Sequence, residues 1–221
     1  NKIICLEYHY MHSDDYLKDF CIENIMPKNN KVLIIACGAL AREIISLIKL
    51  NNWQHISLTC LPANYHLYPE KITGAVEAAV LKYKSDYKSI FIAYADCGTG
   101  GLLESKCKEL GVEMIKGPHC YSFFEGNDKF SNNSENEITA FYLTDFLVNQ
   151  FEAFVWKPMG LDKHPELIEM YFGNYTKLIY QAQTNNSKLD KKAKEISNKM
   201  NLPLERRFTG YGDLEAALSI L

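Results

Sequence analysis

The sequence predicts an α/β fold in which a mostly parallel β-sheet is flanked by helices in a Rossmann-like, three-layer arrangement. Short apolar runs rich in β-branched residues alternate with helical segments along most of the chain, which is typical of parallel α/β architecture. These runs are apolar throughout, as expected of strands buried on both faces. A cysteine follows three of them, which predicts cysteines at the carboxyl ends of strands.

The elements follow one another from residue 31 onward. Strands are predicted at 31–36, 55–61, 89–95, 112–115, 177–183 and 204–208. Helices are predicted over 37–50, 69–84 and 96–110, from Thr144, after Pro165, over 187–201 and from Asp213. Proline suits a first helical turn, and threonine suits a helix N-cap. The polar stretch 127–137 has no periodicity and predicts a surface loop. We predict an N-terminal segment, 1–30, and a single α/β domain over 31–221.

The composition is that of a soluble globular protein. Of the 221 residues, 47% are hydrophobic and 23% are charged, and the formal net charge is −3. This charge argues against nucleic acid or an anionic membrane as the main partner, because both require a basic surface. No apolar run reaches the ~18 residues that cross a bilayer. The seven cysteines are odd in number and form no CxxC pair. The sequence also shows no signal peptide, so we expect a cytoplasmic protein with reduced thiols.

Three cysteines are the candidate metal ligands. Cys37, Cys97 and Cys120 each follow a predicted strand, and the carboxyl ends of parallel strands form the ligand crevice of open sheets. Thiolates are soft ligands that suit zinc or a [4Fe-4S] cluster, and three protein ligands leave one coordination position open. The glycines beside the thiols favour the bulkier cluster slightly. The alternative is that these are small packing residues, as we infer for Cys60 within a strand and Cys107 within a helix.

Several glycines are candidates for cofactor binding. Gly38 and Gly98 follow two of the cysteines and leave backbone room beside them. Gly98, Gly100 and Gly101 lie at a strand-to-helix junction, where backbone N–H groups attract anions. The segment lacks the GxGxxG spacing and the P-loop lysine, so a tight turn beside a bulky site is the alternative.

Four residues are candidates for catalysis. Asp96 suits a general base, an acceptor that orients a metal ligand, or a helix cap. His119 suits a proton donor, because its neighbour Cys120 makes joint ligation of one metal awkward. His164 lies in the polar segment GLDKHPEL, and Arg207 ends a strand, where arginine suits a carboxylate or phosphate. An ordinary surface ion pair is the alternative for Arg207.

The motifs ACGAL, ADCGTGG, GPHCYSFFEG, LTDFL, GLDKHPEL, YFGNY and ERRFTGYGDLE resemble the family catalogued as domain of unknown function 1638. The resemblance runs from about residue 31 to the end. Asn174 departs from it, because we expect histidine there in the family. Genes of the family often accompany corrinoid-dependent methyltransferases of methylamine and betaine type. The resemblance therefore implies a catalytic or accessory part in one-carbon metabolism, with a corrinoid methyltransferase system as partner.

These observations lead to three functional hypotheses. The first is a metal-dependent enzyme that binds a small-molecule substrate at a three-cysteine zinc or iron–sulfur site. The second is a metal-free enzyme that uses two thiols as acid and base, as racemases do, although the racemase motifs ACNT and GCTH are not matched. The third is a non-catalytic carrier of a metal or corrinoid.

Overall fold

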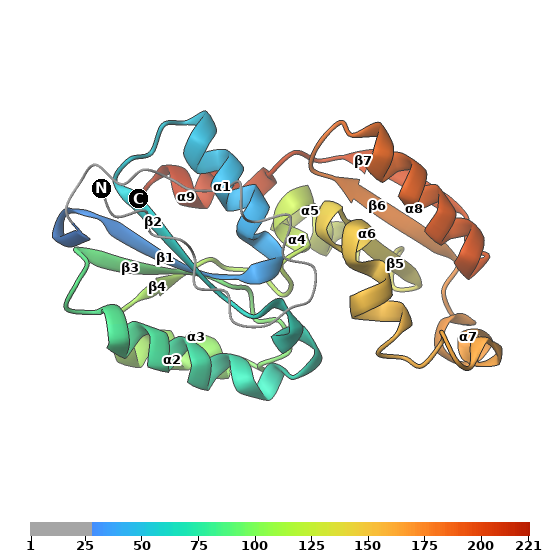
Figure 1. The fold of residues 1–221 in the computed structure, drawn as a ribbon, viewed down its shortest axis with the longest axis horizontal. Helices are drawn as coiled ribbons and strands as arrows, with labels where there is room; N and C mark the ends of the chain where they lie inside the picture. The colour runs from blue at the N-terminus through green and yellow to red at the C-terminus, as the bar shows by residue number, and fades with distance from the viewer. Residues whose placement is uncertain (1–27) are drawn as a thin grey trace. The chain divides into compact units, whose positions relative to one another are not determined.

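The computed structural model describes residues 28–221, which divide into two compact units. The first unit runs to Cys120, and the second spans Tyr121–Ile220. Each unit has its own parallel sheet flanked by helices, so the predicted α/β class is confirmed (Figure 1). The division of 31–221 into domains stays a prediction, and most of the predicted N-terminal segment lies outside the described residues.

The first unit is built around a four-stranded sheet in the order β2-β1-β3-β4. Its elements are β1 (Val32–Cys37), α1 (Ala41–Leu50), β2 (Ile56–Leu61), α2 (Ile72–Tyr83), β3 (Ser89–Ala93), α3 (Leu102–Leu110) and β4 (Glu113–Met114). Short 3-10 turns occur at η2 (Lys28–Asn30), η3 (Gly38–Leu40), η4 (Ala63–Leu67) and η5 (Pro69–Lys71). Every residue of β1 is buried, as its uninterrupted apolar sequence predicts.

The helices of the first unit cover both faces of its sheet. Helix α1 lies on one face, and α2 and α3 lie on the other (Figure 1). The buried side of α1 is formed by isoleucine and leucine at helical spacing, including Ile44, Leu47 and Ile48. Strand β1 pairs in parallel with β2 and β3, so the three strands end at one edge of the sheet. That edge carries the candidate site.

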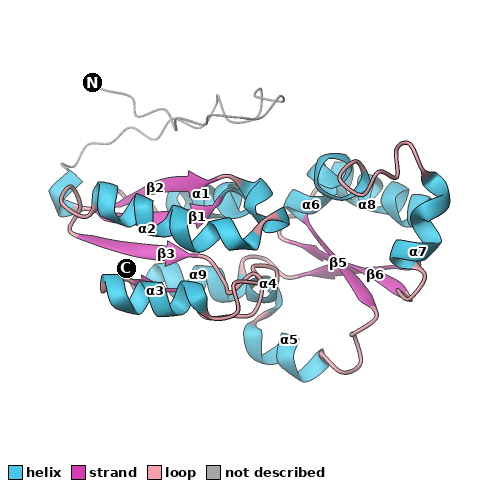
Figure 2. Cartoon of the chain, turned by 90° about the horizontal axis from the view of Figure 1, so that it is seen from below, coloured by secondary structure: helices cyan, strands magenta, loops and turns pink. Residues whose placement is uncertain are grey.

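The second unit has a three-stranded parallel sheet in the order β5-β6-β7. Its elements are α4 (Ser122–Glu125), α5 (Asn127–Asn133), β5 (Ala140–Thr144), α6 (Asp145–Phe151), the π-helical turn η6 (Glu152–Trp156), η7 (Pro165–Leu167), α7 (Ile168–Phe172), β6 (Lys177–Ala182), α8 (Ser187–Met200), β7 (Leu204–Phe208) and α9 (Gly212–Ser219). Helices α6 and α8 lie on one face of this sheet, and α5 lies on the opposite side (Figure 2). Leu143, Leu178 and Tyr180 belong to the hydrophobic core that packs on α6 and α8.

Two elements of the second unit differ from the sequence prediction. Residues 127–133 form helix α5, where a loop was predicted, because none of its residues is buried and the helix therefore has no apolar periodicity. Strand β5 was not predicted, because it runs directly into α6, whose N-cap is its last residue. Thr144 caps α6 as predicted, with its side chain accepting a hydrogen bond from the Leu147 N–H. None of the helices described combines the length and apolar character that a bilayer crossing needs.

Candidate metal centre

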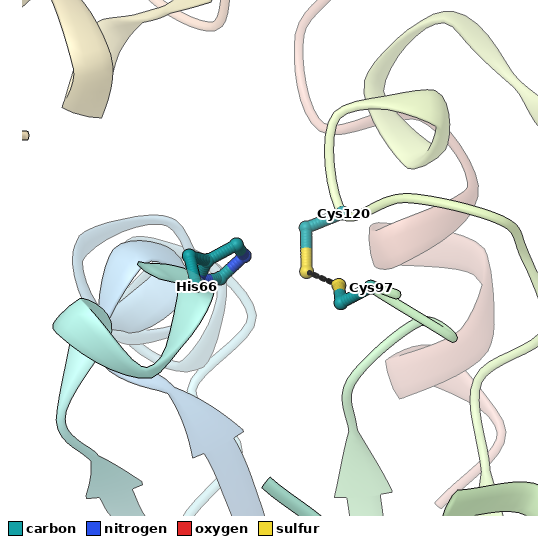
Figure 3. A group of neighbouring side chains, drawn as sticks. All are labelled: His66, Cys97 and Cys120. Atoms are coloured by element: carbon teal, nitrogen blue, oxygen red, sulfur yellow. Dashed lines mark hydrogen bonds between the residues drawn. The ribbon is translucent and has the colours of Figure 1, made fainter. Parts of the chain in front are cut away.

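One group of side chains in the first unit has the composition and spacing of a metal site. The ligand atoms of His66, Cys97 and Cys120 all lie within 4.8 Å of one another. The imidazole ring of His66 points toward the two sulfur atoms (Figure 3). Both cysteines are free and buried, whereas His66 reaches solvent. The group therefore offers two soft sulfur ligands and one nitrogen ligand at the rim of the unit.

Backbone hydrogen bonds bring the two cysteines together. The N–H of Asp96 donates to the carbonyl of Gly117 at 3.0 Å, and the N–H of Cys97 donates to the carbonyl of Pro118 at 3.1 Å. The segment after β3 is thus fixed beside the segment that leads to Cys120. The Sγ atoms of Cys97 and Cys120 are 3.1 Å apart, although the residues are 23 positions apart in sequence.

Cys97 has an unusual backbone conformation that depends on the next turn. Its φ is +48°, which lies in the left-handed region that residues with a Cβ rarely adopt. The carboxylate of Asp96 holds this turn by accepting hydrogen bonds from the N–H of Gly101 at 2.7 Å, the N–H of Gly100 at 3.2 Å and the hydroxyl of Thr99 at 2.8 Å. The Gly101 N–H contributes most to lowering the pKa of Asp96. Two amides that the sequence suggests for cofactor binding therefore bind Asp96.

Gly98 and Gly38 also lie beside the cysteines. Gly98 has a φ of +85°, and a Cβ at this position would lie 3.3 Å from the Cγ of Pro69. The backbone conformation and the close approach of the proline ring therefore both favour glycine at this position. Gly38 begins η3 directly after Cys37, and its carbonyl accepts the N–H of Ala41. Whether these glycines contact a cofactor stays a prediction.

Sequence reasoning did not identify His66. The residue lies in η4, which begins two positions after β2 ends, and Leu61 of β2 pairs with Cys37 of β1. His66 therefore lies at the sheet edge where β1 ends. The signal in the sequence was a histidine within one short turn of a predicted strand end, which is the same criterion that selected the cysteines.

The structure places Cys37 beside His66. Its sulfur is 3.4 Å from the Nδ1 atom of His66 and accepts the N–H of Ala39, also at 3.4 Å. Cys37 is fully buried at the end of β1. The group whose ligand atoms lie within 4.8 Å of one another contains His66, Cys97 and Cys120, and the predicted role of Cys37 as a ligand stays a prediction.

The protonation of the group reflects two adjacent thiols. Hydrogen bonding with Cys120 and burial raise the pKa of Cys97, and His66 opposes this increase. Burial lowers the pKa of His66, but hydrogen bonding to Cys120 and Cys97, together with their charge, outweighs burial and raises it to about 10. The thiol pair thus favours a positive charge beside it.

Two other titratable side chains, Tyr94 and His119, lie near these sulfurs. Burial and then the charge of Cys37 and Cys120 raise the pKa of Tyr94. The Tyr94 hydroxyl has no hydrogen-bond partner among residues 28–221. His119 is half-buried, and burial is the main cause that lowers its pKa, with Asp96 opposing and His66 adding to the decrease. These surroundings favour the neutral form of His119, and its catalytic role stays a prediction.

A cleft of about 620 Å³ opens beside the turn that carries Cys97. Its wall is formed by Asp96 after β3, by Lys108 of α3, by β4, and by Lys116 and Gly117 after β4. Pockets of roughly 300–1,000 Å³ suit small-molecule ligands. The first unit therefore has room for a small molecule close to the loop that positions its thiols.

Two predicted catalytic residues lie in the second unit. His164 is exposed, and its Nδ1 is 3.1 Å from a carboxylate oxygen of Glu166. Arg207 is mostly buried, and its guanidinium donates to the carboxylates of Glu125, Glu137 and Glu205 at 2.9, 2.5 and 2.7 Å. Both residues belong to the second unit, whereas the thiols belong to the first, and the catalytic roles of His164 and Arg207 stay predictions.

Two further cysteines have the surroundings of packing residues. Cys60 lies in β2, and burial followed by Glu43 raises its pKa to about 12. Cys107 lies within α3, and burial followed by Glu104 raises its pKa to about 11. Neither thiol belongs to the group of described ligand atoms that lie within 4.8 Å of one another.

Comparison with known proteins gives a single assignment. Neither the curated proteins nor the solved structures contain a match to the chain. A model of one family, described as a protein of unknown function (DUF1638), matches residues 60–218, a range that includes His66, Cys97 and Cys120. The chain therefore belongs to the protein family of unknown function DUF1638.

Proposed function

We propose that this protein is a metal-dependent enzyme that holds one zinc ion through His66, Cys97 and Cys120. The observation that carries the proposal is that all three ligand atoms lie within 4.8 Å of one another. With Zn–S bonds of about 2.3 Å, two thiolates of a tetrahedral site are separated by about 3.8 Å. The present Sγ–Sγ distance of 3.1 Å is therefore close to that needed for joint binding of one ion.

The mixed donor set favours zinc over an iron–sulfur cluster. A [4Fe-4S] cluster is normally held by four cysteine thiolates, whereas this group supplies two sulfurs and one imidazole. Two cysteines and one histidine are a known set for catalytic zinc, in which water or substrate takes the fourth position. A zinc dication would also balance the charge of two thiolates at this buried position.

A metal-free acid–base pair is less well supported by this geometry. Such a mechanism needs the substrate carbon between a thiolate on one side and a thiol on the other. The sulfurs of Cys97 and Cys120 are in contact at 3.1 Å, which leaves no space for a carbon atom between them.

The substrate that we propose for the open position is a small thiol. Zinc held by these residues would lower the pKa of a bound thiol, whose proton would pass to solvent and leave the sulfur as a nucleophile. The family resemblance adds a methyl–corrinoid partner to the proposal. In that reaction the thiolate sulfur forms a bond to the methyl carbon, and the cobalt–carbon bond breaks with both electrons remaining on cobalt. The cleft of about 620 Å³ beside the Cys97 turn supports a small-molecule substrate.

Metal analysis tests the site directly. The protein is purified anaerobically with a reductant, and its zinc, iron and acid-labile sulfide contents are measured. We expect one zinc per chain, with loss of zinc in H66A, C97S and C120S. C107S is the matched control, because its thiol is buried in α3 away from the group, and it should retain zinc. Stoichiometric iron with sulfide, or zinc that survives in C97S and C120S, would overturn the proposal.

Turnover tests the proposed chemistry. The zinc-loaded protein is incubated with methylcobalamin and a panel of small thiols, and formation of cob(I)alamin is followed by its absorbance under anaerobic conditions. We expect thioether formation that C120S abolishes. Stoichiometric zinc without turnover would favour a metal carrier over an enzyme.

A further inference from the structure

The surroundings of His66 assign a proton to one of its two ring nitrogens. The Nδ1 atom lies 3.2 Å from the carbonyl oxygen of Ala63 and 3.4 Å from the Sγ of Cys37. A carbonyl oxygen can only accept a hydrogen bond, so Nδ1 must carry the hydrogen. In a neutral imidazole, Nε2 then holds the lone pair, and it is the nitrogen available to a metal.

The position of the Cys37 sulfur is independently fixed. Cys37 is the last residue of β1 and has an exposed fraction of 0%. Its sulfur accepts the N–H of Ala39, so it turns back over its own chain at the start of η3. The sulfur is therefore held next to Nδ1 by the strand and by the turn that follows it.

We propose that Cys37 is a positioning residue that orients His66 for metal binding through Nε2 and is not itself a metal ligand. This inference rests on the proposed zinc site. The Nδ1–H bond and the Nε2 lone pair point away from each other across the ring. A sulfur in contact with Nδ1 therefore cannot also lie about 2.3 Å from a metal on Nε2. Groups that hold the second nitrogen of a ligating histidine fix its tautomer, and their loss costs about 10–100-fold in metal affinity.

The alternative is a closed site in which Nδ1 and all three cysteines bind the metal. The two arrangements differ in the number of thiolates on the metal, which cobalt(II) reports through its thiolate-to-metal charge-transfer absorbance. The wild-type protein, C37S, C37A, C97S and C107S are each loaded with cobalt(II) under reducing conditions. Absorbance per bound cobalt and the cobalt and zinc affinities are then measured.

The proposal predicts that C37S and C37A keep the wild-type absorbance per bound cobalt, while C97S loses about half of it as one of two thiolates disappears. Affinity should fall about 10–100-fold in C37A and less in C37S, because the serine oxygen can still accept from Nδ1–H and from the N–H of Ala39. A packing role alone predicts the opposite order, since a buried hydroxyl costs more than a methyl group. C107S should match the wild-type protein in both readouts.

Two results would overturn the inference. One is a fall in absorbance per bound cobalt in C37S, which would make Cys37 a ligand. The other is wild-type affinity in C37A, which would remove any role for Cys37. Failure of the proposed zinc site itself would be distinct, because the wild-type protein would then bind neither metal.

Discussion

The ion network around Glu137 should stabilise the second unit in a pH-dependent way. Glu137 is 8% exposed at its side chain. Its carboxylate accepts hydrogen bonds from Arg207 at 2.5 Å and from the hydroxyl of Tyr142 at 2.6 Å. Hydrogen bonding to Arg207 is the largest of the causes that lower the pKa of Glu137 from 4.5 to about 2.

The sign and size of the effect follow from the lowered pKa. Because the folded state holds the carboxylate ionised, the stabilisation is fully present above pH 4.5 and is lost as the pH falls toward 2. At about 1.4 kcal/mol per pKa unit, this shift corresponds to roughly 3 kcal/mol. Glu137→Gln should lower the free energy of unfolding by that order at pH 7, and the difference from the wild-type protein should shrink as the pH approaches 2.

Urea unfolding at several pH values measures this effect. Trp156 is buried in the core of the second unit, so its fluorescence reports that unit in a Trp53→Phe background. Glu166→Gln is the matched control, because Glu166 is an exposed carboxylate of the same unit in an ion pair with His164. Exposed pairs contribute little, so this control should unfold like the wild-type protein. Equal unfolding free energies for Glu137→Gln and the wild-type protein at pH 7 would refute the reasoning.

Other variants test individual contacts. Tyr180→Phe removes the hydroxyl that donates to Asp145 at 2.7 Å and should cost about 1–3 kcal/mol of unfolding free energy; an unchanged denaturation midpoint would contradict this. Tyr94→Phe removes a buried hydroxyl that has no partner among residues 28–221, so it should be neutral or stabilising by about 1 kcal/mol, and a marked loss of stability would show a missing partner. Gly98→Ala should cost about 1–3 kcal/mol and weaken zinc binding, because φ is +85° and a proline ring lies 3.3 Å from the added Cβ. Gly74→Ala, in open space on a helix, should instead stabilise by about 0.5–1 kcal/mol, and equal effects of the two alanines would refute the backbone argument.

The sequence pattern was sufficient for most of the fold because burial on both faces leaves an uninterrupted apolar run. Strand β1 is the clearest case, with six consecutive buried residues. The pattern failed at a helix without buried residues and at a strand that runs directly into a helix. Helix α5 has no buried residue, and the last residue of β5, Thr144, is the N-cap of α6. The sequence of α5 has no hydrophobic periodicity and resembles a polar loop. The sequence of β5 cannot be separated from the start of the helix that follows it.

The sequence also indicated part of the candidate site. Strand ends meet at one edge of a parallel sheet, and this rule predicted that Cys37, Cys97 and Cys120 would converge. The structure places their sulfurs 3.1 Å apart. His66 was not predicted, because it lies in η4, a short 3-10 turn whose sequence has no apolar periodicity. A tertiary arrangement, the pairing of β1 with β2, brings that turn to the same edge.

Position at the sheet edge is not enough to decide which side chains can share a metal. Cys37 and Cys97 both follow strands, but their backbones differ. Cys37 is extended, with φ −64° and ψ 136°, and its sulfur turns back to the N–H of Ala39. Cys97 is left-handed, with φ +48°, and its sulfur meets that of Cys120. The left-handed turn exists because Asp96 satisfies the amides of the glycines that follow. The residues that shape the backbone between strand and helix therefore set the direction in which each thiol points.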